Sequence, residues 1–403
     1  MSDLFKTYSL REIGKVSMCK RVLKEQTSNF NDIPFYKIST FGGKADTFIS
    51  RDIFEDYKSK YSYPKKGDIL ISAAGTIGKT VIYDGEDGFF QDSNIVWIDN
   101  DESKVLNPFL YYFYQTKPWL TTNGSTITRI YNENLRSIKI IVPKELKDQH
   151  KIASVLSALD SKIELNNRIN TELEAMAKTL YDYWFVQFDF PFDFAQGKPD
   201  KNGRCTEPAE VKPYKTTGGT LVWSEELKRE IPEGWKKIKM SELYEFQYGF
   251  GNTNPNNGGE YPVYGSNGVI GGYDKFNNED APVIGHIGNN CGSLVFADGR
   301  HYVTYNGVMC KIRKGYNKYF GFVVLQSKDL KSHTRGSSQP FISYDMLNSL
   351  DVVIPEPSLM KTYCDLVDPL FDKVIINNKQ NQKLTELRDW LLPMLMNGQV
   401  KAA

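Results

Sequence analysis

The chain has 403 residues, with 50 Lys plus Arg against 49 Asp plus Glu, so its formal net charge is +1. Its length predicts two or three domains, and 40% apolar with 25% charged residues is typical of globular proteins. No apolar run approaches the roughly 18 residues of a membrane span, and residues 1–12 carry no export signal. Composition therefore excludes an integral membrane protein and predicts a cytoplasmic chain that binds no membrane.

The cysteines and histidines are too scattered for a disulfide framework or a metal site. None of the five cysteines forms a C-x-x-C pair, and no two of the four histidines lie within helical reach of each other. We expect reduced thiols and no bound metal.

In chain order, the first predicted domain is a mainly β segment over residues 1–146. A strand at residues 67–72 leads into a Gly-rich loop, and a helix is expected with Asn107 as its N-cap and Pro108 in its first turn. A short helix around Leu135 then precedes a strand that ends at Pro143.

A helical region is predicted next, over residues 147–190. With Ile152 at heptad position a, the sequence forms a coiled-coil seam that carries an asparagine, Asn166, at one a position. The other a positions are Leu159, Leu173 and Leu180, and the d positions are Val155, Lys162, Ile169, Met176 and Tyr183. The alternative is that this helix packs only on its own globular segment.

A linker rich in Pro, Gly and Lys is predicted at 191–227, followed by a second β-rich domain at 228–356 and a second helical region at 357–403. The second half repeats the first, because residues 123–144 align without gaps on residues 335–356. The second helix has Tyr363, Leu370, Asn377, Leu384 and Leu391 at a, and Leu366, Lys373, Gln380, Leu387 and Met394 at d. Asp368 and Pro369 predict that this long helix begins there, and Pro393 should kink or end it.

One motif suggests an enzyme, because residues 73–80, AAGTIGKT, fit the loose form of a phosphate-binding P-loop. A P-loop requires a helix directly after Lys79 and Thr80, whereas the following residues predict a strand and a turn. A second motif, Asn107-Pro108-Phe109, has one proline too few for the methyltransferase motif that it approaches. We find no catalytic constellation of carboxylates, Ser-His-Asp or Cys-His.

The remaining pattern is two similar β-rich domains with Arg, Asn, Gln, Ser and Thr on their loops, each followed by a long helix. These residue types read base edges and contact phosphates in sequence-specific DNA binding. A helix of about 24 residues is about 36 Å long, close to one turn of B-DNA, so two domains on such helices suit two half-sites.

The sequence resembles the specificity subunit of type I restriction-modification enzymes. The resemblance rests on GDILISAAGTIGK, NPFLYYFYQ, GSTITRIYNENLRSIKIIVP, QHKIASVLSALDSKIELNNRINTELE and EELKREIPEGWKKIKMSEL, and with the repeat it covers nearly the whole chain. It implies an α+β fold with two target-recognition domains and two helices that pair as an antiparallel coiled coil. It implies a non-catalytic DNA-binding subunit whose two domains read the halves of a split DNA site. In the second half GNNCGS replaces GTIGKT and QPF replaces ITR, so we predict two different half-sites and an asymmetric target.

The same resemblance implies partners and cofactors. Double-stranded DNA, two adenine methyltransferase subunits docked on the helices, and restriction translocase subunits are the expected partners. This chain should bind no cofactor itself, and S-adenosylmethionine, ATP and Mg²⁺ belong to the partner subunits.

We predict DNA contacts from loop residues of both domains. In the first domain they are Thr76, Lys79, Asn94, Ser125, Thr126 and Arg129. In the second they are His286, Asn289, Asn290, Asn306, Arg335, Ser337 and Gln339. For helix register and partner docking they are Leu159, Asn166, Leu173, Leu370, Asn377 and Leu384.

Three alternatives stay open at this point. The chain could be an enzyme, either an NTPase that uses residues 73–80 or an unrecognised hydrolase. It could be the specificity subunit of a system with a methyltransferase and no nuclease, or a scaffold whose domains bind protein.

Overall fold

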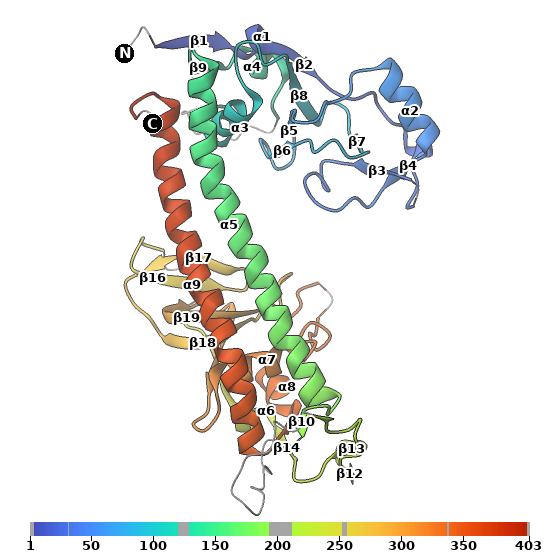
Figure 1. Ribbon diagram of the computed structural model, residues 1–403, viewed down its shortest axis with the longest axis vertical. Coiled ribbons are helices and arrows are strands. Elements are labelled where there is room, and N and C mark those ends of the chain that lie inside the picture. Colours follow the sequence, from blue (N-terminus) through green and yellow to red (C-terminus); the bar gives the residue numbers. More distant parts are fainter. Residues whose placement is uncertain are drawn as a thin grey trace, which may run out of the picture. The chain divides into compact units, whose positions relative to one another are not determined.

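The computed structural model describes residues 4–30, 32–119, 129–192, 212–251, 256–336 and 338–400. It forms two compact units, residues 1–165 with 380–403 and residues 166–379. Each unit contains one β-rich domain together with parts of both long helices (Figure 1). We call the domain of the first unit head 1 and that of the second unit head 2.

Head 1 is built on two small sheets. Its strands are β1 (Phe5–Ser9), β2 (Gly14–Ser17), β3 (Ile33–Tyr36), β4 (Phe48–Ile49), β5 (Ile69–Ser72), β6 (Thr80–Ile82), β7 (Phe89–Phe90), β8 (Ile95–Asn100) and β9 (Lys139–Pro143). Its helices are α1 (Leu10–Ile13), a 3-10 turn at Lys24–Gln26, α2 (Arg51–Lys60), α3 (Asn107–Gln115) and α4 (Asn132–Ser137).

The central sheet of head 1 has the order β2-β8-β5-β6, a second sheet has the order β4-β3-β7, and β1 pairs with β9. All four residues of β5 are buried, which fits a strand of continuous apolar sequence between two layers. One core joins the central sheet to α3, and another, around Phe54 and Phe89, lies against the second sheet.

Head 2 has one larger sheet. Its strands are β14 (Lys236–Lys239), β15 (Tyr244–Tyr248), β16 (Tyr261–Gly265), β17 (Gly268–Tyr273), β18 (Asn278–Gly285), β19 (Leu294–Val303), β20 (Gly307–Ile312) and β21 (Asp351–Ile354). Its helices are α6 (Met240–Leu243), α7 (Lys318–Gln326) and α8 (Tyr344–Ser349). The sheet order is β15-β20-β18-β19-β16-β17, and β14 pairs with β21.

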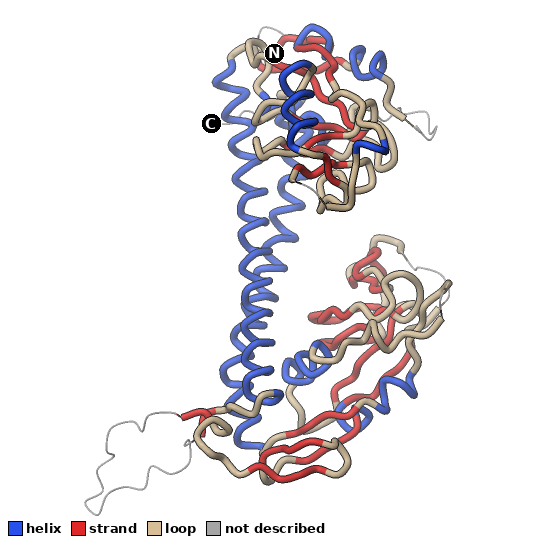
Figure 2. Tube along the Cα trace, turned by 90° about the vertical axis from the view of Figure 1, so that its right-hand side faces the viewer, coloured by secondary structure: helices blue, strands red, loops and turns tan. Residues whose placement is uncertain are grey.

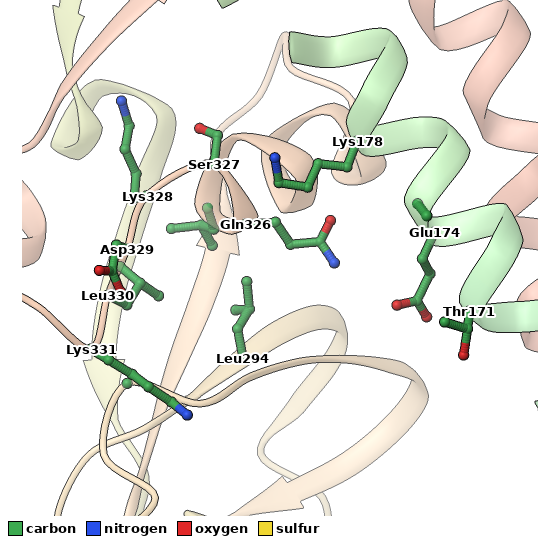
Figure 3. A pocket seen from close by; sticks show the side chains of 13 residues that line it. Thr171, Glu174, Lys178, Leu294, Gln326, Ser327, Lys328, Asp329, Leu330 and Lys331 are labelled. Atoms are coloured by element: carbon green, nitrogen blue, oxygen red, sulfur yellow. The ribbon is translucent and has the colours of Figure 1, made fainter. Parts of the chain in front are cut away.

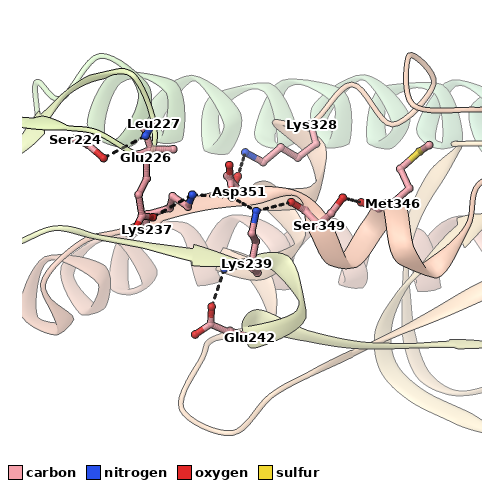
Figure 4. Close-up of polar contacts among 10 residues, drawn as sticks. All are labelled: Ser224, Glu226, Leu227, Lys237, Lys239, Glu242, Lys328, Met346, Ser349 and Asp351. Carbon is pink, nitrogen blue, oxygen red and sulfur yellow. Dashed lines mark hydrogen bonds and ion pairs between the residues drawn. The ribbon is translucent and has the colours of Figure 1, made fainter.

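Charged side chains hold the β14–β21 ribbon of head 2 in register (Figure 4). Lys239 donates to the Asp351 carboxylate at 2.7 Å, and Lys237 lies 3.5 Å from the same carboxylate. Lys328 donates to the Asp351 backbone carbonyl at 2.7 Å, which ties the segment after α7 to this ribbon. The two lysines beside it hold the pKa of Asp351 below its usual value, despite partial burial that acts the other way.

The structure confirms the internal repeat, because equivalent elements of the two heads pair in the same way. The β1–β9, β2–β8, β5–β8 and β5–β6 pairs of head 1 correspond to β14–β21, β15–β20, β18–β20 and β18–β19 of head 2. The helices α3 and α7, and α4 and α8, occupy the same places in chain order. Head 2 therefore repeats the connectivity of head 1 at its centre.

Two long helices complete the structure, α5 (Leu146–Tyr181) and α9 (Pro357–Met396), and Figure 2 shows them side by side. In the first unit Arg388 of α9 forms an ion pair with Asp160 of α5 at 2.9 Å. In the second, the Tyr363 hydroxyl donates to the Ala177 carbonyl at 3.0 Å. Within the second unit Asn170 also donates to Asn378 at 2.8 Å. Residue numbers there rise along α5 as they fall along α9, so the helices pack antiparallel, as the resemblance implied.

The predicted a positions are on the inner face of both helices, but the predicted d positions are wrong. Met176 and Leu366 are more than half exposed, and Val155 and Leu387 are also exposed. The second inner row lies four residues after each a position instead of three: Leu156, Ile163, Asn170 and Ala177 on α5, Trp184 in the π-helical turn after α5, and Val367, Val374, Asn381, Arg388 and Leu395 on α9. Apolar residues stand in both rows, so the sequence pattern alone did not decide which row is buried.

The predicted start of the second helix is also wrong, because α9 begins at Pro357 and continues through Pro369. The helix tolerates Pro369 in its interior because side chains of head 2 bind it on both sides of this proline. The Asn317 amide donates to the Asp368 carboxylate and the Tyr319 hydroxyl to Asp372, both at 2.8 Å. These tertiary contacts offset the backbone hydrogen bond that proline removes. Helix α9 ends at Met396, one turn after Pro393.

Two further boundaries differ from expectation. Leu106, not Asn107, is the N-cap of α3, and the buried Asn107 side chain instead accepts from Asn100 at 2.8 Å. The predicted linker at 191–227 contains the short strand pair β10 (Pro191–Phe192) with β11 (Lys212–Pro213) and the strand β12 (Leu221–Ser224). Strand β12 pairs with β13 (Arg229–Pro232), and a π-helical turn at Asp182–Val186 follows α5.

No helix in the described part of the chain is long and apolar enough to cross a membrane.

Candidate nucleic-acid interface

In head 1, backbone hydrogen bonds join three separate segments at one place: the loop after β5, the turn before β8, and residues 129–130. The Ala73 amide donates to the Asn94 carbonyl at 2.7 Å, and the Ile130 amide donates to the Ala73 carbonyl at 2.8 Å. The predicted residues Thr76, Lys79, Asn94 and Arg129 all belong to these segments. The fold therefore brings together residues that lie up to 53 positions apart in the sequence.

The Arg129 side chain is the most informative of this group. It is half-buried, and its Nη2 donates to the Ser93 backbone carbonyl at 2.7 Å. A guanidinium has five N–H donors in a fixed plane, so this bond orients the group and leaves donors for a ligand. The Lys79 ammonium instead donates to the Phe41 carbonyl at 2.6 Å, while Thr76 is exposed on the loop and Asn94 is half-buried.

The same loop excludes the P-loop interpretation. Lys79 and Thr80 are followed by strand β6, which pairs antiparallel with β5, so no helix N-terminus follows the motif. Gly78 is required for another reason: its φ is +77°, and a Cβ there would lie 2.2 Å from Trp119 Nε1. This glycine makes a tight hairpin turn under an aromatic ring and does not cradle a phosphate.

A cleft of about 530 Å³ lies beside this site in head 1. Arg21, Lys24 and Lys37 line it, and so do Gln91 and Asp92, which immediately precede the Ser93–Asn94 turn. Arg21 and Lys24 next to these loops are suited to DNA phosphates, as is Lys37, which also pairs with Asp46 at 2.9 Å. Sequence reasoning missed these residues, because Arg21 and Lys37 belong to segments with no repeat partner or motif.

Head 2 repeats the two backbone hydrogen bonds of Ala73 in head 1, which we call the backbone frame, with different side chains. The His286 amide donates to the Asn306 carbonyl at 2.8 Å, and the Ile342 amide donates to the His286 carbonyl at 3.1 Å. Arg335 and Phe341 exchange backbone hydrogen bonds at 2.9 and 2.8 Å, and the Gly288 amide donates to Pro340 at 2.9 Å. The segments with the predicted residues His286, Asn306, Arg335 and Gln339 therefore meet.

His286 is only 4% exposed, so its ring presents little surface to a ligand. It stacks on Tyr248 with ring centroids 4.1 Å apart, and Tyr248 stacks on Tyr344 at 3.8 Å. Nδ1 lies 3.1 Å from the Tyr305 carbonyl. Burial lowers the pKa of His286, which favours the neutral ring, and the bond to Tyr305 acts weakly the other way.

The other predicted residues of head 2 are on its surface. Asn289, Asn290, Asn306, Arg335 and Gln339 are exposed, and the Asn290 amide donates to the Asn267 side chain. Sequence reasoning missed two exposed aromatic residues at this site, Tyr305 and Phe341, although the repeat alignment places Phe341 opposite Arg129. Ser125, Thr126 and Ser337 lie outside the described residues.

A second cleft, of about 580 Å³, lies between α5 and the end of α7 in the second unit (Figure 3). Glu174 and Lys178 of α5 face Gln326 and Lys331 across it. Burial raises the pKa of Glu174. Of the predicted DNA-contacting residues that the structure describes, none lines this cleft.

Among the described residues, no group of three or more His, Cys, Asp or Glu side chains could hold a metal ion. The described cysteines Cys19, Cys291, Cys310 and Cys364 are buried free thiols.

Comparison with known families gives a match over most of the chain. The model of the type I restriction modification DNA specificity domain matches residues 2–175 and again residues 232–386, one copy for each head and its helix. The chain belongs to this family. It is the DNA-binding specificity subunit of a type I restriction-modification enzyme and is itself non-catalytic.

Relatives of this specificity subunit agree. It is 25% identical to the type I restriction enzyme MjaIX specificity subunit of Methanocaldococcus jannaschii, over 99% of this chain and 93% of the relative. It is 52% identical over 187 residues to a putative specificity subunit, S.HindORF215P, of Haemophilus influenzae, a match covering 46% of this chain and 48% of that relative.

Among solved structures, the S subunit of a type I system from M. genitalium has the same fold. Its TM-score is 0.56 at 17% identity, with 98% of this chain and 97% of that chain covered. This likeness confirms the architecture of two β-rich heads, each followed by a long helix.

Proposed function

We propose that each head of this specificity subunit reads one half of a split DNA site. The observation that carries the proposal is the repeated backbone frame. In both heads two equivalent backbone hydrogen bonds join three segments. These are the loop after β5 or β18, the turn before β8 or β20, and the segment before α4 or α8. A frame kept in both heads with different side chains on it is what two readers of different base sequences require.

The target should be asymmetric. Arg129 and Ala73 occupy the frame in head 1, where Phe341 and His286 stand in head 2. A permanent cation with several N–H donors and a neutral aromatic group do not select the same base edges. A palindromic target would contradict the proposal.

The remaining predicted residues divide by chemistry. Asn289, Asn290, Asn306 and Gln339 carry exposed amides that suit adenine, while Arg335 suits guanine or a phosphate. The cations of the head 1 cleft position the backbone of the DNA and should make binding strongly dependent on salt.

We propose that the antiparallel helices set the spacer between the half-sites and dock two adenine methyltransferase subunits. The support is a group of exposed apolar side chains outside the inner seam: Val155 and Met176 on α5, Tyr183 in the π-helical turn after α5, and Leu366 and Leu387 on α9. Such exposed apolar side chains suit a protein partner. Restriction translocase subunits would join the same complex, and S-adenosylmethionine, ATP and Mg²⁺ would be bound by the partners.

The test is co-expression of this chain with the adjacent methyltransferase gene in a methylation-free host, followed by long-read mapping of modified adenines. We expect a split asymmetric motif that disappears when this chain is omitted. A complex that forms but leaves no motif would contradict DNA reading by the heads and favour a scaffold. The neighbouring genes show whether a nuclease subunit accompanies the system.

A further inference from the structure

In each head a backbone carbonyl at an equivalent position holds one side chain of the candidate site. The β5–β8 and β18–β20 registers pair Ile71 with Val96 and Ile284 with Val308, which makes Ser93 equivalent to Tyr305. In head 1 the Ser93 carbonyl accepts from Arg129 Nη2 at 2.7 Å. In head 2 the Tyr305 carbonyl lies 3.1 Å from His286 Nδ1. The equivalent carbonyls of Ser93 and Tyr305 therefore hold a guanidinium in head 1 and an imidazole in head 2.

In head 1 the result is a charged donor group. The planar fork of N–H donors on Arg129 matches the O6 and N7 acceptors of guanine. The neighbouring side chains at the frame, Ala73 and Ser93, are small.

In head 2 the same place is aromatic. His286 fills the position of Ala73, and Tyr248 stacks on it from β15. Phe341, in the position of Arg129, is 40% exposed, and Tyr305 is 41% exposed. An exposed ring on a supported loop suits the 5-methyl group of thymine, the one apolar feature of the major groove.

We infer that these equivalent positions determine specificity in both heads: Arg129 reads a guanine in the first half-site, and Phe341 contacts a thymine methyl in the second. His286 is a positioning residue, because its backbone joins Asn306 to Ile342, the residue after Phe341. This inference rests on the proposed function and adds the residue and the chemical group that it reads.

The experiment uses the complex of this chain with its methyltransferase and duplexes that carry the mapped motif. Each thymine of the second half-site is replaced in turn by deoxyuridine, which removes only the methyl group. At one position we expect the parent complex to bind about fourfold more weakly, the value for one buried methyl group. Phe341→Ala should show no such difference, and Phe341→Leu should keep part of it.

The matched test in head 1 replaces each guanine of the first half-site by 7-deazaguanine, which removes the N7 acceptor. The parent should lose affinity at one guanine, and Arg129→Ala should be indifferent to that change. Two control variants should keep both responses. In Arg136→Ala an arginine of α4 that pairs with Glu133 is removed, and in Trp223→Ala an exposed aromatic residue of β12 is removed.

The outcomes separate the two claims. If the motif exists but has no thymine in its second half-site, or if Phe341→Ala responds to deoxyuridine as the parent does, this inference is overturned and the proposed function stands. An Arg129→Ala complex that still responds to 7-deazaguanine overturns the head 1 part. If mapping finds no motif at all, the proposed function fails and the inference with it.

Discussion

His286 and His301 are two buried side chains of head 2 that the fold keeps neutral. Burial lowers the pKa of both below the usual 6.5, and for His301 hydrogen bonding to Gly299 and nearby carboxylates oppose this weakly. His301 is fully buried, with Nε2 3.0 Å from the Asn278 amide and Nδ1 2.8 Å from the Gly299 carbonyl. The Asn278 amide donates to Nε2, so a proton there would face another donor.

Head 2 should therefore lose stability in mild acid. Because the native pKa values are depressed, both histidines take up protons more readily when unfolded. Their contribution is fully present above about pH 6.5 and is lost as the pH falls through the native values. Urea unfolding at pH 7.5 and 5.5, followed by hydrogen exchange in each head, measures this. Head 1 has no histidine before His150, and it serves as the internal control. An equal acid shift in a His286→Gln, His301→Gln variant would contradict the assignment.

Arg335 is a second residue with a separate expected effect. Its backbone is fixed by the two hydrogen bonds to Phe341, and its side chain is exposed. Arg335→Ala should weaken DNA binding by about 1 to 3 kcal/mol if the arginine reads guanine, and it should relax the second half-site only. Affinity and motif measured for the assembled complex decide this. Arg300→Ala, an exposed arginine of the same head paired with Glu279, is the control. A uniform loss across all sequences would instead assign Arg335 to a phosphate.

At the scale of elements, the buried asparagines of the helix pair are the main polar feature of the inner face. Asn166, Asn170, Asn377 and Asn381 are all at least nine-tenths buried. Asn377 donates to the Asn170 side chain, and Asn170 donates to Asn378, both at 2.8 Å. Such cross-helix pairs fix register, because a shift of one helix leaves buried amides without partners.

Replacing one of these asparagines should lower the free energy of unfolding, whereas replacing all four should not. Asn170→Leu removes the partner of buried Asn377 and should lower the free energy of unfolding by about 1 to 3 kcal/mol. Replacing all four by Leu should restore or raise stability while loosening helix register. Urea unfolding measures the first effect, and the spacer length in the methylation motif measures the second. Lys162→Leu, at an exposed position of α5, should be nearly neutral. An unchanged spacer length in the variant with all four asparagines replaced would contradict their role in helix register.

The elements show how far sequence reasoning reached. The strand at residues 139–143, the short helix at 132–137 and the repeat of both in the second half were predicted, because alternation and proline punctuation are local signals. The second inner row of each helix and the start of α9 were not. Both depend on contacts from head 2 or from the facing helix, such as those of Asn317 and Tyr319, which no local pattern contains.

At the scale of the whole molecule, the exposed apolar side chains of the helices predict where partner subunits bind. Met176→Lys and Leu387→Lys should reduce complex formation with the methyltransferase, because each places a charge in an apolar contact. Unfolding midpoints should change little, since both side chains are exposed. Trp223→Lys, at an exposed residue of the β12–β13 hairpin, is the control. Pull-down and analytical sedimentation measure assembly, and full complex formation by both variants would place the docking surface elsewhere.

The sequence by itself determined the repeat, the two β-rich heads, the long helices and membership of the specificity-subunit family. Those features are written in local periodicity and in motifs that survive alignment of one half on the other. The tertiary structure decided which side chains occupy equivalent places in the two heads. Arg129 meets Ser93, and His286 meets Tyr305, through strand registers and backbone hydrogen bonds between segments far apart in the chain. Such contacts depend on how strands pair, and pairing is set by the packing of the whole head.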